Sequence, residues 1–316
     1  MSRREGALAV ALLALLALAP LAASNVLLNF IMSALIVALA AQGWNLLAGF
    51  GGQFSFGHAA FFGTGAYAAA ILQVRYGANA WAACLCGLLA GGAVGWIIGG
   101  LAFRARLRGS YFALITLAFA EVLRICANAA PIAGGAAGLL VKLDARAANF
   151  QFSSRAAFVW VALGCVAAVL AGTAALARSR FGAYLVAVRE NEDAARALGV
   201  DTLAVKLRAI TLSGAITAAA GCLYTQYFLY IDANIAFGAR ISVEALLAAI
   251  VGGVGTVLGP VVGALALHGL GELARLAAGG ATGIDLVLFG LVLVAVIAFA
   301  PGGIVGSARR LRGGRA

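Results

Sequence analysis

The chain has 316 residues, of which 64% are hydrophobic and only 10% are charged, and its mean hydropathy is +1.04. Soluble domains carry about 25% charged residues because they need that surface to remain in water, so this composition excludes a compact soluble fold. The formal net charge of +11 does not predict binding to nucleic acid. The basic residues stand in short clusters at the ends of apolar runs, where they orient a membrane protein.

The apolar runs are long enough for several helices that cross a membrane. No Asp, Glu, Lys or Arg stands between Glu5 and Arg75, and one helical crossing needs about 20 residues. Lipid offers no partner to an unpaired backbone group, and these runs are too long and too uniformly apolar for the strands of a barrel. We therefore expect an all-α integral membrane protein. The candidate spans are 6–23, 26–48, 54–73, 80–103, 110–128, 156–177, 208–230, 241–255, 257–278 and 284–301.

The first candidate span allows two interpretations. Arg3 and Arg4 followed by an apolar run could form a signal peptide, and Leu21-Ala22-Ala23 loosely matches a cleavage site. The run is long for such a peptide, however, and another apolar segment follows at once. We favour a retained first span.

Residues 241–278 leave the number of spans open between eight and ten. The candidate span 241–255 is short for a complete crossing, which favours a broken or re-entrant helix. Ten spans with the N-terminus inside place 15 of the 22 basic residues on the cytoplasmic face, as the positive-inside rule requires. We expect about ten spans, both termini in the cytoplasm and a single domain over 1–316. Four glycines interrupt the region: Gly252, Gly253, Gly255 and Gly259.

Two candidate spans carry glycines at helical spacing. At 3.6 residues per turn such residues share one face, and a glycine face lets another helix approach closely. We favour tight static packing, with helices that slide past one another as the alternative. The glycines are Gly87, Gly91, Gly95 and Gly99 in the span 80–103, and Gly255, Gly259 and Gly263, of which the first lies just before the span 257–278 and the other two lie in it.

Polar side chains inside apolar spans are costly and therefore mark candidate sites. Glu121 lies in the fifth span with Arg124 three residues later, a spacing that places both on one helix face. His268 and Glu272 lie late in the ninth span. Such groups could form a proton relay or an ion site, but they are few and scattered, so we favour structural pairing. The candidate pathway residues are Gln53, Ser55, Gly57, His58, Glu121, Glu244, Gly252, Gly253, Gly255 and Thr256.

The segment 178–207 is the most charged stretch and is expected on the cytoplasmic side. We predict one helix over Arg180–Gly199, with an apolar side that includes Tyr184 and Leu198, and Gly199 suits a left-handed cap. A helix that only lies on a membrane is rich in Lys and Arg, whereas this one mixes both signs, which favours a protein partner. The candidate contact residues are Arg189, Glu190, Glu192, Asp193, Ala194, Ala195, Arg196 and Gly199.

The sequence lacks the motifs of an enzyme. A phosphate-binding loop needs Gly-Lys-Ser/Thr, but the only lysines, Lys142 and Lys206, follow valines. There is no metal-ligand spacing and no nucleophile–base set, and the five cysteines are best explained as buried small side chains. We therefore expect no catalytic residue, no metal and no cofactor. Any ATP hydrolysis must belong to another chain.

Four stretches of the chain match motifs that occur together in one transporter family. They are residues 52–63 (Gly-Gln-Phe-Ser-Phe-Gly-His-Ala-Ala-Phe-Phe-Gly), residues 242–260, residues 180–199, and Pro301-Gly302-Gly303. As a set they resemble the branched-chain amino-acid ABC permeases of the LivM type, over roughly residues 25–305. The third stretch is similar to the Glu-Ala-Ala-x-x-x-Gly motif with which importer permeases contact their ATPase, with Asp193 in place of Glu. The fourth lacks the family's usual arginine.

The resemblance implies a permease subunit of an ATP-binding-cassette importer, in the lipid of the bacterial cytoplasmic (inner) membrane. It makes 178–207 the cytoplasmic coupling segment. The implied partners are a second permease of similar fold, two ATP-hydrolysing subunits and an extracytoplasmic substrate-binding protein.

One departure from the family pattern affects the substrate. The family often has Thr-Gly-Gly-Thr-Asn-Gly in the outer loop, whereas residues 133–138 of this chain are Ala-Gly-Gly-Ala-Ala-Gly. Branched-chain amino acids are the expected substrate. Urea, amides or aromatic acids, which relatives handle, are alternatives, and so is an ion-coupled secondary transporter.

Overall fold

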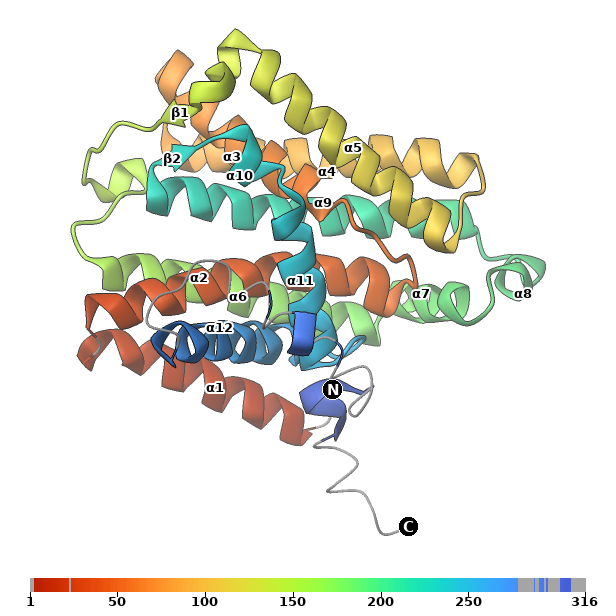
Figure 1. Ribbon diagram of the computed structural model, residues 1–316. Coiled ribbons are helices and arrows are strands. Elements are labelled where there is room, and N and C mark those ends of the chain that lie inside the picture. Colours follow the sequence, from red (N-terminus) through yellow and green to blue (C-terminus); the bar gives the residue numbers. More distant parts are fainter. Residues whose placement is uncertain are drawn as a thin grey trace.

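The computed structural model describes residues 3–22, 24–277, 287, 290–292, 294 and 302–307. These residues form a helical bundle with one short pair of strands (Figure 1). The strands β1 (Leu139–Leu140) and β2 (Tyr230–Ile231) pair antiparallel, and a π-helical segment, Asn45–Phe50, continues α2. The helices are α1 (Arg3–Ala22), α2 (Asn25–Trp44), α3 (His58–Tyr76), α4 (Ala80–Arg104), α5 (Gly109–Ala129), α6 (Arg155–Arg178), α7 (Arg180–Glu190), α8 (Glu192–Ala197), α9 (Thr202–Phe228), α10 (Ala233–Ala236), α11 (Ala239–Gly252) and α12 (Gly259–Ala277).

The prediction of an α-helical membrane protein is confirmed. Within the described part of the chain, six segments are long and apolar enough to cross a membrane: Asn25–Phe50, Ala80–Arg104, Gly109–Ala129, Arg155–Arg178, Thr202–Phe228 and Ala233–Gly252. The candidate span 284–301 falls mostly outside the described residues. The count of ten spans therefore stays a prediction.

The start of α9 differs from the apolar run that predicted it. The run begins at residue 208, but the helix begins at Thr202. Asp201 caps this end, because its carboxylate accepts a hydrogen bond from the backbone N–H of Ala204 at 3.0 Å, as acidic N-cap residues do. The cap extends the helix beyond the apolar zone and places Lys206 within its first turns.

The long helices run roughly along one common direction, with α7 and α8 at one end of the bundle and the strand pair at the other (Figure 1). α9 lies in the middle and packs against α4, α3 and α2. α5 lies on the outside of the bundle, and α11 crosses the other helices steeply (Figure 1). The two ends of the bundle therefore carry different kinds of structure: short charged helices at one and a short sheet at the other.

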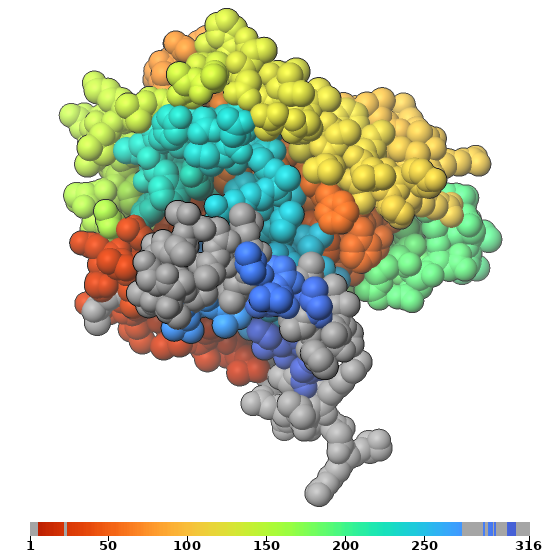
Figure 2. All heavy atoms as spheres, viewed as in Figure 1, coloured from red at the N-terminus to blue at the C-terminus, as the bar shows by residue number. Residues whose placement is uncertain are grey.

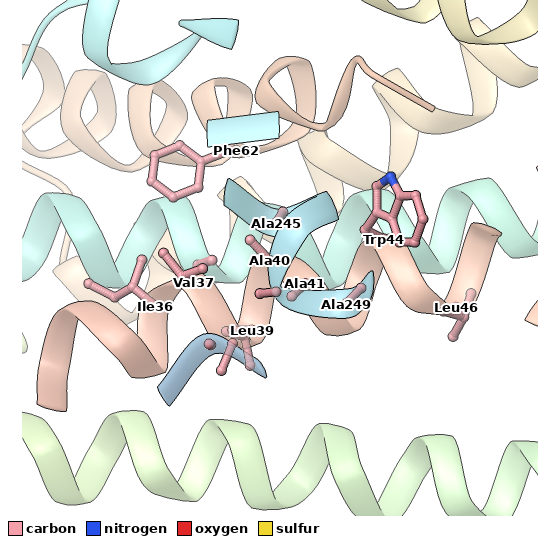
Figure 3. Close-up of a cluster of buried hydrophobic side chains, with 14 of the residues drawn as sticks. Ile36, Val37, Leu39, Ala40, Ala41, Trp44, Leu46, Phe62, Ala245 and Ala249 are labelled. Atoms are coloured by element: carbon pink, nitrogen blue, oxygen red, sulfur yellow. The ribbon is translucent and has the colours of Figure 1, made fainter. Parts of the chain in front are cut away.

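α2 forms the centre of the hydrophobic core. Every residue from Ala34 to Phe50 is buried, and the helix contacts α9, α12, α6 and α11. In Figure 3 side chains of α2 gather with Phe62 of α3 and with Ala245 and Ala249 of α11. Because lipid cannot reach residues 34–50, hydrogen-bond partners for the polar side chains there have to come from within the protein.

Four glycines of α4, at positions 87, 91, 95 and 99, face neighbouring helices at very short range. A Cβ atom added at Gly95 would lie only 2.7 Å from the carbonyl oxygen of Ile210 on α9. Gly91 and Gly99 meet the same helix, and Gly87 meets both α9 and α3. Lipid tails are as apolar as the side chains of the helices, so an apolar side chain gains little by leaving lipid for a helix contact. Close van der Waals packing therefore has to supply the attraction between these helices.

α11 and α12 make a second close contact, on either side of a loop formed by residues 253–258. The space that a Cβ atom would need at Gly252 is filled by backbone of α12, and the space at Gly263 is filled by backbone of α11. α12 then runs along α2, where the ring of His268 lies edge-on to Phe30 with 6.3 Å between ring centroids. The loop therefore reverses the chain inside the bundle.

The glycine contact between α4 and α9 predicts unequal effects of two alanines in one helix. Gly95→Ala should lower the unfolding temperature in detergent by several degrees, because its methyl group overpacks a backbone oxygen, at a cost of about 1–3 kcal/mol. Gly100→Ala is the matched control, since its Cβ would meet nothing within 4 Å, and it should leave the temperature unchanged or raise it, because alanine favours helix. Equal unfolding temperatures for the two variants would contradict the packing described here.

Candidate functional site

Two short helices, not one, form the charged segment between α6 and α9. The prediction of a single helix over Arg180–Gly199 was wrong, because α7 ends at Glu190 and α8 begins two residues later. Asn191 between them has extended backbone angles. Its side-chain oxygen accepts hydrogen bonds from two backbone N–H groups of α8, at 3.1 Å from Asp193 and 2.9 Å from the next residue. Asparagine is a strong N-cap residue, so it stops one helix and starts another.

Gly199 ends α8 in the left-handed conformation that the sequence predicted. Its φ is +87°, and the backbone N–H of Val200 donates to the carbonyl oxygen of Ala195 at 3.1 Å, as in glycine caps. Nothing lies within 4 Å of the position of an added Cβ atom. A larger residue would therefore strain the backbone without clashing with a neighbour.

Glu192 binds three basic side chains from different parts of the fold. Its carboxylate lies 2.7 Å from the Lys206 ammonium on α9, 2.9 Å from Arg196 and 3.2 Å from Arg108, which precedes α5. Asp193 adds ion pairs to Arg108 and Arg196 at 3.1 and 3.2 Å. The side chains of Glu192 and Lys206 are only 10% and 4% exposed. This cluster fixes α8 to α9 and to the α4–α5 connection.

The charges of this cluster keep both carboxylates ionised. Burial opposes the ionisation of Glu192, but the hydrogen bond from Lys206 and the charges of Lys206, Arg108 and Arg196 outweigh it, and the pKa of Glu192 is lowered from its ordinary value of 4.5. The hydrogen bond from Arg108 likewise lowers the pKa of Asp193. The stabilisation is therefore complete at neutral pH and is lost only as the pH falls through these lowered values.

The apolar residues of α7 and α8 divide between two faces. Leu185, Val188 and Ala195 are buried against the bundle, whereas the side chains of Tyr184 and Leu198 are 45% and 86% exposed. The outward face therefore combines apolar side chains with the carboxylates of Glu190 and Asp193 and the arginines that pair with them. Such a face, with aromatic and apolar residues among charges, is typical of a contact with another protein.

Arg189 connects α7 to the centre of the bundle. Its guanidinium donates a hydrogen bond to the carbonyl oxygen of Gly49 at 2.9 Å and two more to the Glu190 carboxylate at 2.6 and 3.1 Å. Gly49 belongs to the π-helical end of α2. Gly52 packs on the same side chain, since a Cβ atom there would lie 2.7 Å from the Arg189 Cγ. A displacement of α7 therefore acts directly on α2.

The π-helical segment also holds the 253–258 loop. The Asn45 amide donates to the carbonyl oxygen of Thr256 at 2.9 Å and accepts from the backbone N–H of Gly255 at 2.8 Å. Gln42 donates to the carbonyl oxygen of Val257 at 2.8 Å. Four hydrogen bonds, counting that of Arg189 to Gly49, thus link α7, α2 and the loop. Within the loop, the Thr256 hydroxyl donates to the carbonyl oxygen of Gly253 at 2.7 Å.

Ser55, Gly57 and His58 lie in a second hydrogen-bonded group. The His58 Nε2 lies 2.9 Å from the Ser213 Oγ on α9, and the Ser213 hydroxyl donates to the carbonyl oxygen of Gly43 at 2.7 Å. The backbone N–H of Gly57 donates to the Ser55 hydroxyl at 3.2 Å. His58 is completely buried. Burial and a local hydroxyl partner favour a structural role for this histidine.

The other candidate pathway residues occupy different places. Gln53 donates to the carbonyl oxygen of Gly51 at 3.2 Å, within the irregular stretch that ends where α3 begins. Because residues 51–57 are irregular, α3 begins at His58, four residues after the start of the predicted span. Gly252 and Gly253 lie at the end of α11, against α12 and residues 302–307. The structure thus gathers the candidate residues into several groups, not one site.

Glu121 and Glu244 belong to a polar strip on α5, α10 and α11, in which Glu121 is exposed and Glu244 is buried. Arg124 donates to Glu121 at 2.6 and 2.9 Å and to the Asn234 side chain at 2.7 Å, which joins α5 to α10. Arg240 donates to Glu244 at 2.7 Å. The side chains of Glu121 and Arg240 are 53% and 62% exposed. In Figure 2, α5 lies across this face beside α10 and α11. Charges exposed along apolar helices have to meet protein or water, because lipid excludes them.

Three important residues were missed by the sequence reasoning. Lys206 and Arg108 were counted only as orienting charges, although they pair with Glu192 and Asp193. Asn45 went unnoticed, although a buried amide in a long apolar run is a signal that it holds another segment. For metals, the described residues contain no group of three or more His, Cys, Asp or Glu side chains that could hold an ion.

The Glu192 cluster predicts that one substitution loosens α8 and that a second repairs it. Glu192→Gln leaves the buried Lys206 ammonium without its main counter-charge, so hydrogen exchange of the amides in 192–199 should become about five- to tenfold faster. Adding Lys206→Met removes the orphaned charge and should return exchange close to the original rate. If Glu192→Gln leaves α8 exchange unchanged, the cluster does not hold this helix.

Comparison with known proteins places the chain in a family. Residues 26–297 match the family described as the permease component of the branched-chain amino acid transport system. The high-affinity branched-chain amino acid transport system permease protein LivM of Escherichia coli K12 is 31% identical over 292 residues, which cover 84% of this chain and 68% of that protein. The LivM protein of Salmonella typhimurium is 29% identical, with 76% of this chain and 62% of that protein covered.

More distant similarity reaches the autoinducer 2 import system permease protein LsrC of Escherichia coli O9:H4, which is 31% identical over 47% of this chain and 45% of that protein. No solved structure matches the chain. The resemblance inferred from the four sequence motifs is confirmed, because the family match extends over most of the 316 residues. The chain belongs to the family of branched-chain amino acid transport system permeases.

Proposed function

We propose that this protein is the membrane-spanning permease subunit of an ATP-binding-cassette importer in the bacterial inner membrane, and that it carries branched-chain amino acids. The match to the permease family over residues 26–297 is the observation that carries this proposal. The named relatives are permease proteins of transport or import systems. This supports a transport subunit that does not itself hydrolyse ATP. It does not favour the alternative of an ion-coupled transporter that works alone. The similarity to LsrC covers less than half of the chain, so branched-chain amino acids are the better supported substrate.

The α7–α8 pair is the element proposed to bind an ATP-hydrolysing subunit. Its support is threefold: Glu192 fixes α8 to the bundle, Leu198 faces outward, and Arg189 reaches inward to Gly49. Asn45 continues the connection to the 253–258 loop. When the ATPase pair closes, a movement of α8 would pass through these hydrogen bonds to α2 and to the loop, and access to the pathway would switch from one side to the other.

The polar strip on α5, α10 and α11 is proposed to face the second permease. Glu121 and Arg240 are exposed charges, and Arg124 is partly exposed, on helices that are otherwise apolar, and a second permease would shield them from lipid. A pair of such strips would form a polar path between the two subunits. The substrate-binding protein would deliver the amino acid at the end that carries β1 and β2.

Ten spans with both termini in the cytoplasm are proposed for the topology. α12 begins beside the π-helical end of α2 and leads toward Phe30, near the start of α2. Residues 302–307 lie back against Gly253. His268 of α12 and residues 302–307 thus lie toward opposite ends of the bundle.

The coupling proposal predicts that changes in α8 separate the permease from its ATPase. Asp193→Lys, which reverses a charge, and Gly199→Val, which strains the cap, should leave the protein inserted and paired with its sister permease. Co-purification of the ATPase subunits and substrate-stimulated ATP hydrolysis should fall about tenfold or more. Asp144→Lys is the matched control, because this carboxylate lies at the other end of the bundle, where it pairs with Arg146 and accepts a hydrogen bond from Asn149; the variant should bind the ATPase normally.

Two other results would contradict the coupling proposal. If both α8 variants recover their ATPase and transport as the original protein does, α8 is only a membrane-surface element. If the purified chain alone takes up substrate under a proton or sodium gradient, the protein is a secondary transporter.

The topology predicts the side from which single cysteines react with an impermeant thiol reagent. Cysteines at Asn79 and Asn149 should react from outside, and cysteines at Asn191 and Ser307 should react only after the membrane is opened. Asn79 lies next to the 147–149 turn, since its amide donates to the carbonyl oxygen of Ala148 at 2.8 Å. Labelling of position 307 from outside would rule out ten spans while leaving the helical bundle intact.

A further inference from the structure

A basic pocket lies beside α8, at the end of the bundle away from the strands. Its volume is about 410 Å³, and the end of α4, the α4–α5 connection, α8 and the first turns of α9 form its walls. Two carboxylates, Glu192 and Asp201, line it as well. Five basic side chains line it: Arg104, Arg106, Arg108, Arg196 and Lys206.

The carboxylates of the cluster neutralise only part of this positive charge. Glu192 and Asp193 engage Arg108, Arg196 and Lys206. Arg104 and Arg106 make no ion pair and no side-chain hydrogen bond with any residue that the structure describes. The guanidinium groups of Arg104 and Arg106, which line the pocket, therefore remain available to an anion.

The backbone at Arg106 points to a use for its side chain. Arg106 has a φ of +55°, and it ends α4 in a cap where the N–H of Leu107 donates to the carbonyl oxygen of Ala102 at 3.0 Å. Glycine is the usual residue at this position because it has no Cβ atom to strain. An arginine in a conformation that favours glycine is expected where the guanidinium contributes something that glycine cannot.

The remaining lining of the pocket is apolar and lies at the edge of the membrane. Phe103, Val200 and Leu203 contribute to it, and the Lys206 ammonium lies 4.9 Å above the centre of the Phe103 ring. α4 and α9 are both long and apolar enough to span the bilayer. The pocket therefore lies where these helices leave the apolar zone, at the level of lipid headgroups.

We propose that this pocket binds a phosphate anion, and that the membrane supplies it as the headgroup of an anionic phospholipid. The arginines donate hydrogen bonds to the phosphate oxygens, for which guanidinium groups are well suited. The apolar wall of the pocket packs against the start of the lipid chains. Basic pockets between spanning helices at a membrane surface bind anionic headgroups in this way. A bound lipid would also adjoin Arg108 and Arg196 and so support the position of α8. The proposal rests on α4 and α9 crossing the membrane and does not depend on the importer function.

The test uses the purified full-length chain alone, stripped of lipid in neutral detergent. Phosphatidylglycerol, phosphatidylcholine and inorganic phosphate are added in turn, and binding is measured by native mass spectrometry and by the shift in unfolding temperature. Phosphatidylglycerol should bind in preference to phosphatidylcholine, and inorganic phosphate at millimolar concentration should weaken its binding. Arg104→Gln combined with Arg106→Gln should weaken phosphatidylglycerol binding by about tenfold or more, because each basic residue near the surface contributes to this attraction.

The control variant removes two charges outside the pocket. Arg180→Gln with Arg208→Gln should change phosphatidylglycerol binding less than twofold. Arg106→Gly provides a second pocket variant that relieves the backbone conformation while it removes the charge, so weaker lipid binding by this variant cannot be attributed to misfolding.

Three results would overturn the proposal or its source. If the pocket variants and the control variant weaken phosphatidylglycerol binding equally, the binding is due to general surface charge and not to the pocket. If inorganic phosphate stabilises the protein but phosphatidylglycerol binds no better than phosphatidylcholine, the pocket is a phosphate site and the lipid is not the source of the phosphate. Unchanged phosphatidylglycerol binding by the pocket variants would exclude Arg104 and Arg106 from the lipid site and overturn the proposal. None of these results depends on transport, so each is distinct from a failure of the importer proposal.

Discussion

The bundle depends on close backbone approach at glycine. Lipid provides no net drive to bury apolar side chains, so helices must attract one another through tight packing and hydrogen bonds. Gly95 admits the backbone of α9, and Gly252 and Gly263 admit α12 and α11 to one another. The helices α9, α11 and α12 that are joined in this way also pack against α2, and the buried Gln42 and Asn45 bond to the 253–258 loop. Packing thus dictates where the internal polar connections can form.

Those polar connections give the protein a mechanical route from its surface to its core. The route begins with the Glu192 cluster, which holds α8 rigidly, and enters the bundle through the bond from Arg189 to Gly49. It continues through Asn45 to Gly255. Because the hydrogen bonds join a π-helical end and a glycine loop, which deform more easily than regular helix, movement can pass along them while the α4–α9 contact stays closed.

Local patterns in the sequence predicted the features that depend on neighbouring residues. The apolar runs predicted the helical membrane protein, the four-residue repeat in 80–103 predicted a glycine face, and Gly199 predicted a left-handed cap. Contacts between distant residues left no such pattern: Arg108 pairs with Asp193 from 85 positions away. The break at Asn191 was overlooked because the charges continue across it, even though asparagine is a strong cap. The start of α9 was misplaced for a similar reason, because the Asp201 cap lies outside the apolar run.

The central claim is that α8 meets an ATP-hydrolysing subunit, and a cross-link tests it most directly. In a variant without the five native cysteines, a cysteine replaces Leu198, whose side chain is 86% exposed, and the purified complex is treated with a short bifunctional reagent that joins this thiol to lysine. A cross-link to the ATPase subunit is expected from position 198 and not from Leu140, which is 72% exposed at the opposite end. Absence of that cross-link in a complex that hydrolyses ATP on addition of substrate would contradict the account.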